Sequence, residues 1–123
     1  MGRKKYYGYK PKFEHYSVTL YIKRGNVGEQ ITFCYENGSS QLNHYLWGSS
    51  VDYDYSSDGE VEQNYYFDEE NTKRLMLRTG TKNGKNLVSA IHERFQAAKS
   101  YSDKEMRKWC DTKGIEYHTR VWY

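Results

Sequence analysis

The spacing of the apolar residues changes near Asp68, and this change limits the folds that the chain can adopt. Before Asp68, apolar and polar residues alternate over short stretches, which is typical of β-strands. After Asp68, apolar residues recur every three or four positions, which is typical of amphipathic helices. Residues 115–123 alternate again. The order predicts an α+β domain, with about three short helices packed on one face of a mostly antiparallel sheet of four to five strands and a C-terminal closing strand.

Two strands are predicted near the N-terminus, over residues 15–23 and around residues 31–35. A turn is expected between them at residues 25–28. The side chains expected on the buried side of the two strands are Tyr16, Val18, Leu20, Ile22, Ile31, Phe33 and Tyr35. Residues 39–47 allow two interpretations. They form either a short helix capped by Ser40 or a third strand.

Residues 51–67 predict a β-hairpin with a three-residue loop, Ser57-Asp58-Gly59. A left-handed Gly59 would place Tyr55 opposite Val61. A two-residue loop would mix apolar and acidic side chains on both faces, so the hydrophobic pattern favours the three-residue loop. In this register one face carries Val51, Tyr53, Tyr55, Val61, Tyr65 and Phe67, and the other carries Asp52, Asp54, Glu60, Glu62 and Tyr66.

The helices are predicted from their end signals. Asp68 is expected to cap the first helix, and Gly80 follows its end. The second helix is expected over about residues 85–98. Ser102 and Glu105 form the pattern of a capping box at the start of the third helix, and Gly114 ends it.

Charge is divided along the chain. Residues 25–72 contain ten acidic side chains and no Lys or Arg. Residues 1–24 contain seven basic and one acidic side chain, and residues 73–123 contain twelve basic and five acidic ones. A surface with one sign of charge attracts an opposite charge over about 10 Å at physiological salt. The pattern therefore predicts a protein that binds a charged partner.

Residues 1–13 are expected to form a basic, tyrosine-rich mobile arm, and residues 14–123 a single domain. The arm alternates cationic and aromatic side chains, a composition that suits phosphate contacts and stacking on bases. Its candidate nucleic-acid-binding residues are Arg3, Lys4, Lys5, Tyr6, Tyr7, Tyr9, Lys10 and Lys12.

The sequence contains no pattern typical of catalysis or of a cofactor site. Its four histidines are scattered, and Cys34 and Cys110 fit free thiols in a reducing cytoplasm. The segment GTKNGKN (80–86) lacks the spacing and the Ser or Thr of a phosphate-binding loop. We therefore expect no catalytic residue, no metal ligand, no cofactor and no contact with a membrane. A cytoplasmic location is expected, and the oligomeric state is left open.

An acidic, tyrosine-rich hairpin imitates the charge of a nucleic-acid backbone. In size, sheet-then-helix order and charge separation, the chain resembles small immunity proteins that neutralise bacterial toxins and phage-encoded inhibitors of the anti-CRISPR type. The resemblance implies a non-enzymatic protein that inhibits or neutralises a partner with a basic surface, such as a nuclease. The candidate partner-binding residues are Asp52, Tyr53, Asp54, Tyr55, Asp58, Glu60, Glu62 and Tyr66. The alternative is a nucleic-acid-binding module that uses the arm and the basic helices.

Overall fold

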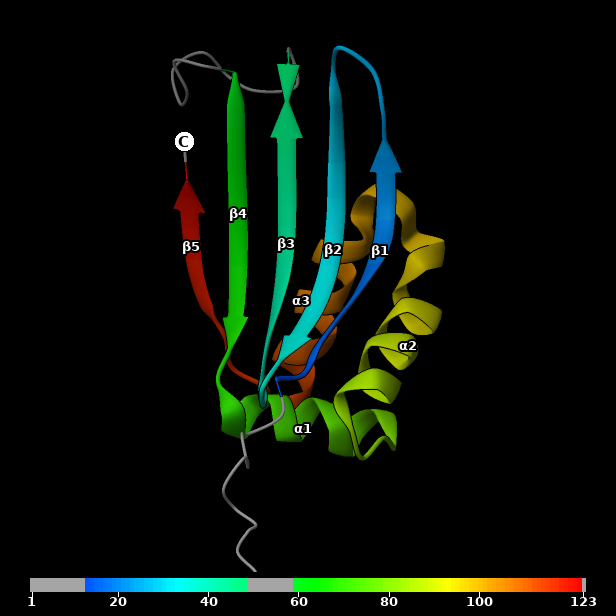
Figure 1. Cartoon of the computed structure of the whole chain (residues 1–123), viewed down its shortest axis with the longest axis vertical. Coiled ribbons are helices and arrows are strands. Elements are labelled where there is room, and N and C mark those ends of the chain that lie inside the picture. Colours follow the sequence, from blue (N-terminus) through cyan, green and yellow to red (C-terminus); the bar gives the residue numbers. More distant parts are fainter. Residues whose placement is uncertain (1–12, 49–58, 123) are drawn as a thin grey trace, which may run out of the picture.

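The chain forms one five-stranded antiparallel sheet in which the strands follow one another in sequence order (Figure 1). The computed structural model describes residues 13–48 and 59–122. The strands are β1 (His15–Lys23), β2 (Gly28–Glu36), β3 (Ser39–Trp47), β4 (Glu60–Phe67) and β5 (His118–Trp122). The α+β class and the closing strand are thus confirmed. Residues 39–47 form the third strand, so the helical interpretation of this segment is wrong.

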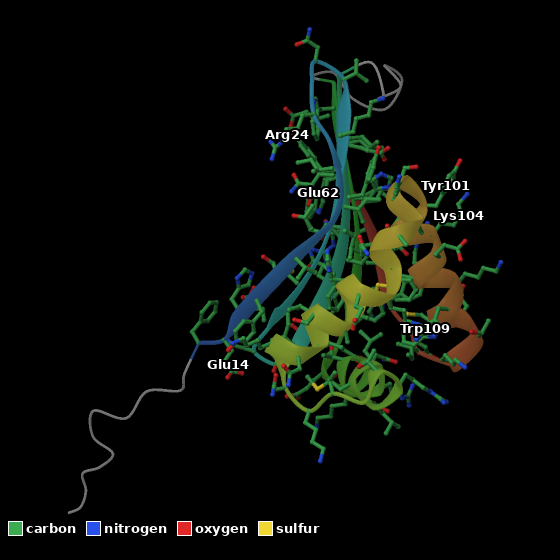
Figure 2. The ribbon with its side chains drawn as sticks, turned by 90° about the vertical axis from the view of Figure 1, so that its right-hand side faces the viewer. Glu14, Arg24, Glu62, Tyr101, Lys104 and Trp109 are labelled. Carbon is green, nitrogen blue, oxygen red and sulfur yellow. The ribbon has the colours of Figure 1, made fainter. Side chains whose placement is uncertain are left out.

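The helices lie on one side of the sheet, as the edge-on view in Figure 2 shows. They are α1 (Glu69–Thr79), α2 (Gly84–Phe95), the 3-10 helix η2 (Gln96–Tyr101) and α3 (Ser102–Lys113). Helix α2 packs on β1 and β2, α1 packs on the ends of β3 and β4, and α3 lies beside β3. Because α2, η2 and α3 follow one another without a break, there are two helical runs rather than three separate helices. We call the side of the sheet that faces the helices the inner face and the opposite side the outer face.

Three of the predicted helix signals are confirmed and one is wrong. The Asp68 carboxylate accepts a hydrogen bond from the Asn71 backbone N–H at 2.8 Å, and Gly80 and Gly114 end α1 and α3 in the left-handed conformation. Ser102 does not cap α3. Its hydroxyl lies close to the backbone carbonyls of Phe95 (3.0 Å) and Lys99 (2.6 Å), so it supports the bend between α2 and α3 instead.

The core lies between the inner face and the helices. Its fully buried side chains come from β2, β3 and β4 on one side and from all three α-helices on the other. They include Ile31, Phe33, Leu42, Phe67, Leu75, Leu87, Ile91 and Met106.

A β-bulge in β1 corrects the predicted alternation of that strand. The register between β1 and β2 shifts between Thr19 and Tyr21, so one extra residue is inserted in β1. Beyond the shift, Tyr21 pairs with Ile31 on the inner face, whereas Ile22 pairs with Gln30 on the outer face. The strand was correctly predicted, but the faces of its last residues were assigned the wrong way round.

The predicted hairpin within residues 51–67 is also wrong. Strand β4 pairs with β3 along Glu60–Phe67 and with β5 along Glu62–Tyr66. Both edges of the central part of β4 are therefore occupied by β3 and β5, which is not the predicted pairing, and residues 51–58 of the predicted hairpin lie outside the described residues. The side-chain alternation within β4 is nevertheless confirmed, because Val61, Tyr65 and Phe67 are buried while Glu60 and Tyr66 are exposed.

Replacement of Gly84 by Ala is expected to destabilise the protein by about 1–3 kcal/mol, the usual range for overpacking a core. Gly84 is the first residue of α2, and a methyl group there would overlap the ring of Tyr35 on β2. Urea unfolding measures the change. Ser89→Ala, at an exposed site of the same helix, is the control and should change the free energy of unfolding by less than about 0.5 kcal/mol. Equal stability of the two variants would contradict the close packing of α2 on Tyr35.

Candidate binding face

The outer face of the sheet is not covered by any helix of the described chain (Figure 2). The strand registers place one set of alternating residues on it. From β2 to β5 these are Gln30, Thr32, Cys34, Glu36, Gln41, Asn43, Tyr45, Trp47, Glu60, Glu62, Asn64, Tyr66, His118, Arg120 and Trp122. Amides, carboxylates and aromatic rings dominate the set, and the β2, β3 and β4 members include no Lys or Arg. Such a surface can bind another molecule by hydrogen bonds, charge and ring contacts together.

A row of hydrogen-bonded amides crosses the centre of this face. The Asn43 side-chain oxygen accepts hydrogen bonds from the amide groups of Gln41 (2.5 Å) and Asn64 (2.6 Å). The Asn64 amide also donates to Glu62 Oε2 at 3.1 Å. These contacts fix the orientation of the four side chains before any partner binds, which lowers the entropy lost on binding.

Aromatic side chains surround the amide row. The rings of Tyr45 and Trp47 lie 5.4 Å apart, and the Trp47 indole N–H donates to the Gly25 carbonyl at 2.9 Å. Tyr66 and Trp122 are 41 % and 54 % exposed. Tyr and Trp are the residues that most often dominate the affinity of protein interfaces.

Two hollows lie side by side on the outer face. The one over β2, β3 and β4 has a volume of about 330 Å³ and is lined by Gln30, Thr32, Asn43, Tyr45 and Glu62. The one over β3, β4 and β5 has a volume of about 500 Å³ and is lined by Gln41, Asn64, Tyr66, His118, Thr119 and Arg120. The outer face is therefore concave at two places, and each hollow is large enough to receive a side chain of a partner.

Three of the predicted partner-binding residues lie on this face. Glu60, Glu62 and Tyr66 lie on β4 an even number of residues apart, which places all three on the outer face. The remaining predicted residues lie outside the described residues, as do the candidate nucleic-acid-binding residues of the arm. They are Asp52, Tyr53, Asp54, Tyr55 and Asp58 in one segment, and Arg3, Lys4, Lys5, Tyr6, Tyr7, Tyr9, Lys10 and Lys12 in the other.

Some acidic side chains of the middle segment are neutralised within the chain. Glu29 pairs with His44, and Glu70 pairs with Arg74 on the surface of α1 at 2.8 Å. No Lys or Arg among the described residues, 13–48 and 59–122, forms an ion pair with Glu36 or Glu62. Glu36 and Glu62 are thus two carboxylates of the outer face that can still pair with a cation of an external partner.

Sequence reasoning missed most of the amides and rings of the outer face. Gln41, Asn43, Tyr45 and Trp47 alternate in sequence, and this signal is visible once residues 39–47 are taken as a strand. Their alignment with Asn64 and Arg120 depends on pairing with β4 and β5, which are distant in sequence.

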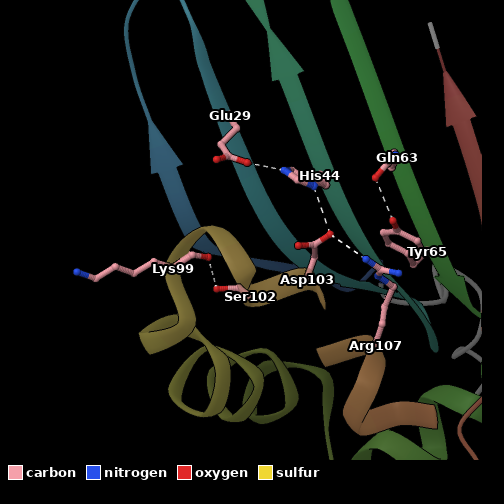
Figure 3. A network of polar contacts seen from close by, with 8 residues as sticks. All are labelled: Glu29, His44, Gln63, Tyr65, Lys99, Ser102, Asp103 and Arg107. Atoms are coloured by element: carbon pink, nitrogen blue, oxygen red, sulfur yellow. Dashed lines mark hydrogen bonds and ion pairs between the residues drawn. The ribbon is translucent and has the colours of Figure 1, made fainter. Parts of the chain in front are cut away.

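The inner face contains a second polar cluster, which sequence reasoning also missed (Figure 3). His44 on β3 lies between two carboxylates, with Nε2 2.6 Å from Glu29 Oε2 and Nδ1 3.2 Å from Asp103 Oδ2. Arg107 lies 3.4 Å from the same Asp103 oxygen, and its guanidinium stacks over the ring of Tyr65 at 4.5 Å. The cluster connects β2 and β3 to the first turns of α3.

Hydrogen bonding sets the charge of this cluster. Burial alone would lower the pKa of His44, but the hydrogen bonds to Asp103 and Glu29 outweigh it, and the pKa of His44 is raised. Burial likewise opposes ionisation of Asp103, yet its contacts with His44 and Arg107 lower its pKa. Since carboxylates only accept hydrogen bonds, contacts to both of them require both ring nitrogens of His44 to donate, which favours the imidazolium form. With both nitrogens engaged, His44 is a structural link rather than a free base.

The two thiols are not activated. Burial raises the pKa of Cys34, and the nearby Glu36 raises it further. Burial raises the pKa of Cys110 to about 12. A nucleophilic cysteine needs the opposite shift. Among the described residues, no group of three or more His, Cys, Asp or Glu side chains is arranged to hold a metal ion.

No protein-family model, curated protein or solved structure matches this chain. In the part of the chain that the structure describes, no helix has the length and apolar character needed to cross a membrane. The functional interpretation therefore depends on the surface itself.

Proposed function

We propose that this chain is a small non-enzymatic binding protein that inhibits or neutralises a partner protein through the outer face of its sheet. One observation carries the proposal. The outer face of β2, β3 and β4 combines Glu36, Glu60 and Glu62 with aromatic rings and contains no Lys or Arg. A partner with a basic surface, such as a nuclease or another protein that handles nucleic acids, complements this face.

The outer face could bind such a partner through two properties, the negative charge of its carboxylates and the apolar area of its aromatic rings. Carboxylates on one face attract a cationic surface and increase the association rate. Exposed Tyr66 and Trp122 supply rigid apolar area that excludes water around the ion pairs. In this role the chain would act as the immunity and anti-CRISPR-type inhibitors do, by occupying the surface that its partner uses for nucleic acid.

Charge reversal on the outer face tests the proposal. The tagged protein captures its partner from an extract of the native host, and the purified pair is then titrated. Glu60→Lys combined with Glu62→Lys is expected to raise the dissociation constant about 100-fold or more, since each ion pair becomes a repulsion. Glu93→Lys combined with Glu105→Lys changes the net charge equally on exposed positions of α2 and α3 and is expected to leave the dissociation constant within about threefold.

A parallel titration with single- and double-stranded oligonucleotides addresses the alternative function. Tight oligonucleotide binding that weakens steeply with salt, and that neither double variant affects, would contradict the proposal and support a nucleic-acid-binding module. Equal weakening of partner binding by the two double variants would show that net charge, and not the outer face, determines recognition.

A further inference from the structure

The residues that line the hollow over β2, β3 and β4 favour the binding of one kind of side chain. Its volume is about 330 Å³, and among its lining residues Glu62 is the charged one, beside the ring of Tyr45. We infer that this hollow receives an arginine side chain of the partner protein. The inference rests on the proposed function and names the chemical group that the outer face recognises.

Glu62 has unused hydrogen-bonding capacity. Its Oε2 accepts one hydrogen bond from the Asn64 amide at 3.1 Å, and its Oε1 accepts none from the described part of the chain. A carboxylate offers about four acceptor sites. No described Lys or Arg forms an ion pair with Glu62, although the side chain is only half-exposed. A half-buried carboxylate of this kind is stabilised when a cation with several N–H donors arrives.

The amide row prepares Glu62 for such a ligand. Asn43 Oδ1 already accepts hydrogen bonds from Gln41 and Asn64, so it competes little for a further donor. The Asn43 amide is directed toward the Thr32 hydroxyl at 3.5 Å. The strongest available acceptor in the hollow is therefore the Glu62 carboxylate, which Asn64 holds in place.

The neighbouring ring favours arginine over lysine. A guanidinium is planar, donates two parallel hydrogen bonds to a carboxylate and stacks on an aromatic ring at the same time. The Tyr45 ring borders the hollow and is itself supported by the Trp47 ring at 5.4 Å. The ammonium group of lysine is compact and strongly hydrated, so contact with the Tyr45 ring stabilises it less.

The test uses three small probes with the full-length protein, namely N-acetyl-arginine amide, N-acetyl-lysine amide and N-acetyl-citrulline amide. Their binding is followed in ¹H–¹⁵N spectra through the side-chain amide signals of Gln30, Asn43 and Asn64. The arginine probe is expected to shift these signals with a dissociation constant several-fold lower than that of the lysine probe. The uncharged citrulline probe is expected to leave them unchanged.

Variants locate the site. Glu62→Gln is expected to raise the dissociation constant of the arginine probe at least about tenfold, and Tyr45→Leu is expected to remove the preference for arginine over lysine. Glu36→Gln removes a carboxylate on the same face but outside the hollow and is expected to have no effect. The spectra themselves report whether each variant is folded. Binding of the citrulline probe, or unchanged arginine binding by a folded Glu62→Gln variant, would overturn the inference.

The outcomes for the inference and for the proposed function differ. If the arginine probe fails to bind but capture of a basic partner still depends on Glu60 and Glu62, only the inference is wrong. If the probe binds as expected while no partner is captured through the outer face, the proposed function is wrong.

Discussion

Replacement of His44 by Gln is expected to lower the free energy of unfolding by about 3 kcal/mol at neutral pH. His44 connects Glu29 on β2 to Asp103 on α3, at 2.6 and 3.2 Å. The Asp103 side chain is 6 % exposed and the Glu29 side chain 19 %, so neither carboxylate is well hydrated without the imidazolium. Removing one partner of a buried ion pair costs about 3–5 kcal/mol, and the low end applies because Arg107 still contacts Asp103.

The pH dependence of stability distinguishes this cause from simple loss of packing. The pKa of His44 is raised in the folded protein, so its contribution is complete below the ordinary pKa of histidine, about 6.5. The contribution is then lost as the pH rises through the folded pKa. Wild-type protein should therefore become less stable on the alkaline side of this range, and His44→Gln should lack that loss.

Urea unfolding at a series of pH values measures both effects. His15→Gln is the matched control, because His15 is exposed on β1, and it should keep the stability and the pH profile of the wild type. A decrease below about 1 kcal/mol for His44→Gln, with the wild-type pH profile retained, would show that the cluster does not hold α3 on the sheet.

Replacement of Phe33 by Ala is expected to lower the free energy of unfolding by about 3–5 kcal/mol. Phe33 lies at the centre of the inner face, is fully buried, and meets the ring of Phe67 on β4 edge to face at 6.4 Å. Its removal loses the transfer free energy of the ring and leaves a cavity that neighbouring strands cannot close without breaking their registers.

Chemical denaturation with Leu77→Ala as the control checks this expectation. Leu77 is apolar but 78 % exposed on α1, so its truncation should change stability by less than about 0.5 kcal/mol. Comparable losses for the two variants would mean that the inner face is not the centre of the core.

The local signals of the sequence predicted most of the fold. Strand β1 has the predicted bounds, residues 15–23, and Asp68 and Gly80 bound α1 as their preferences predict. These features depend on interactions between residues that are close in sequence, so the residue order determines them. The errors in β1 and at Ser102 arise where tertiary contacts changed the local preference. A bulge turned the last residues of β1, and the bend after α2 placed the Ser102 hydroxyl near carbonyls of the preceding turn.

The sequence by itself determined that β2, β3 and β4 carry carboxylates and no Lys or Arg in any register, because residues 25–72 contain neither basic residue. The tertiary structure decided where those charges lie. The period-two alternation of a strand does not determine which strands it pairs with, and in the structure β4 pairs with β3 and β5. That choice aligns Asn43, Asn64 and Glu62 across two strands and places His44 against α3. Cross-strand alignment is a long-range property that local spacing does not encode.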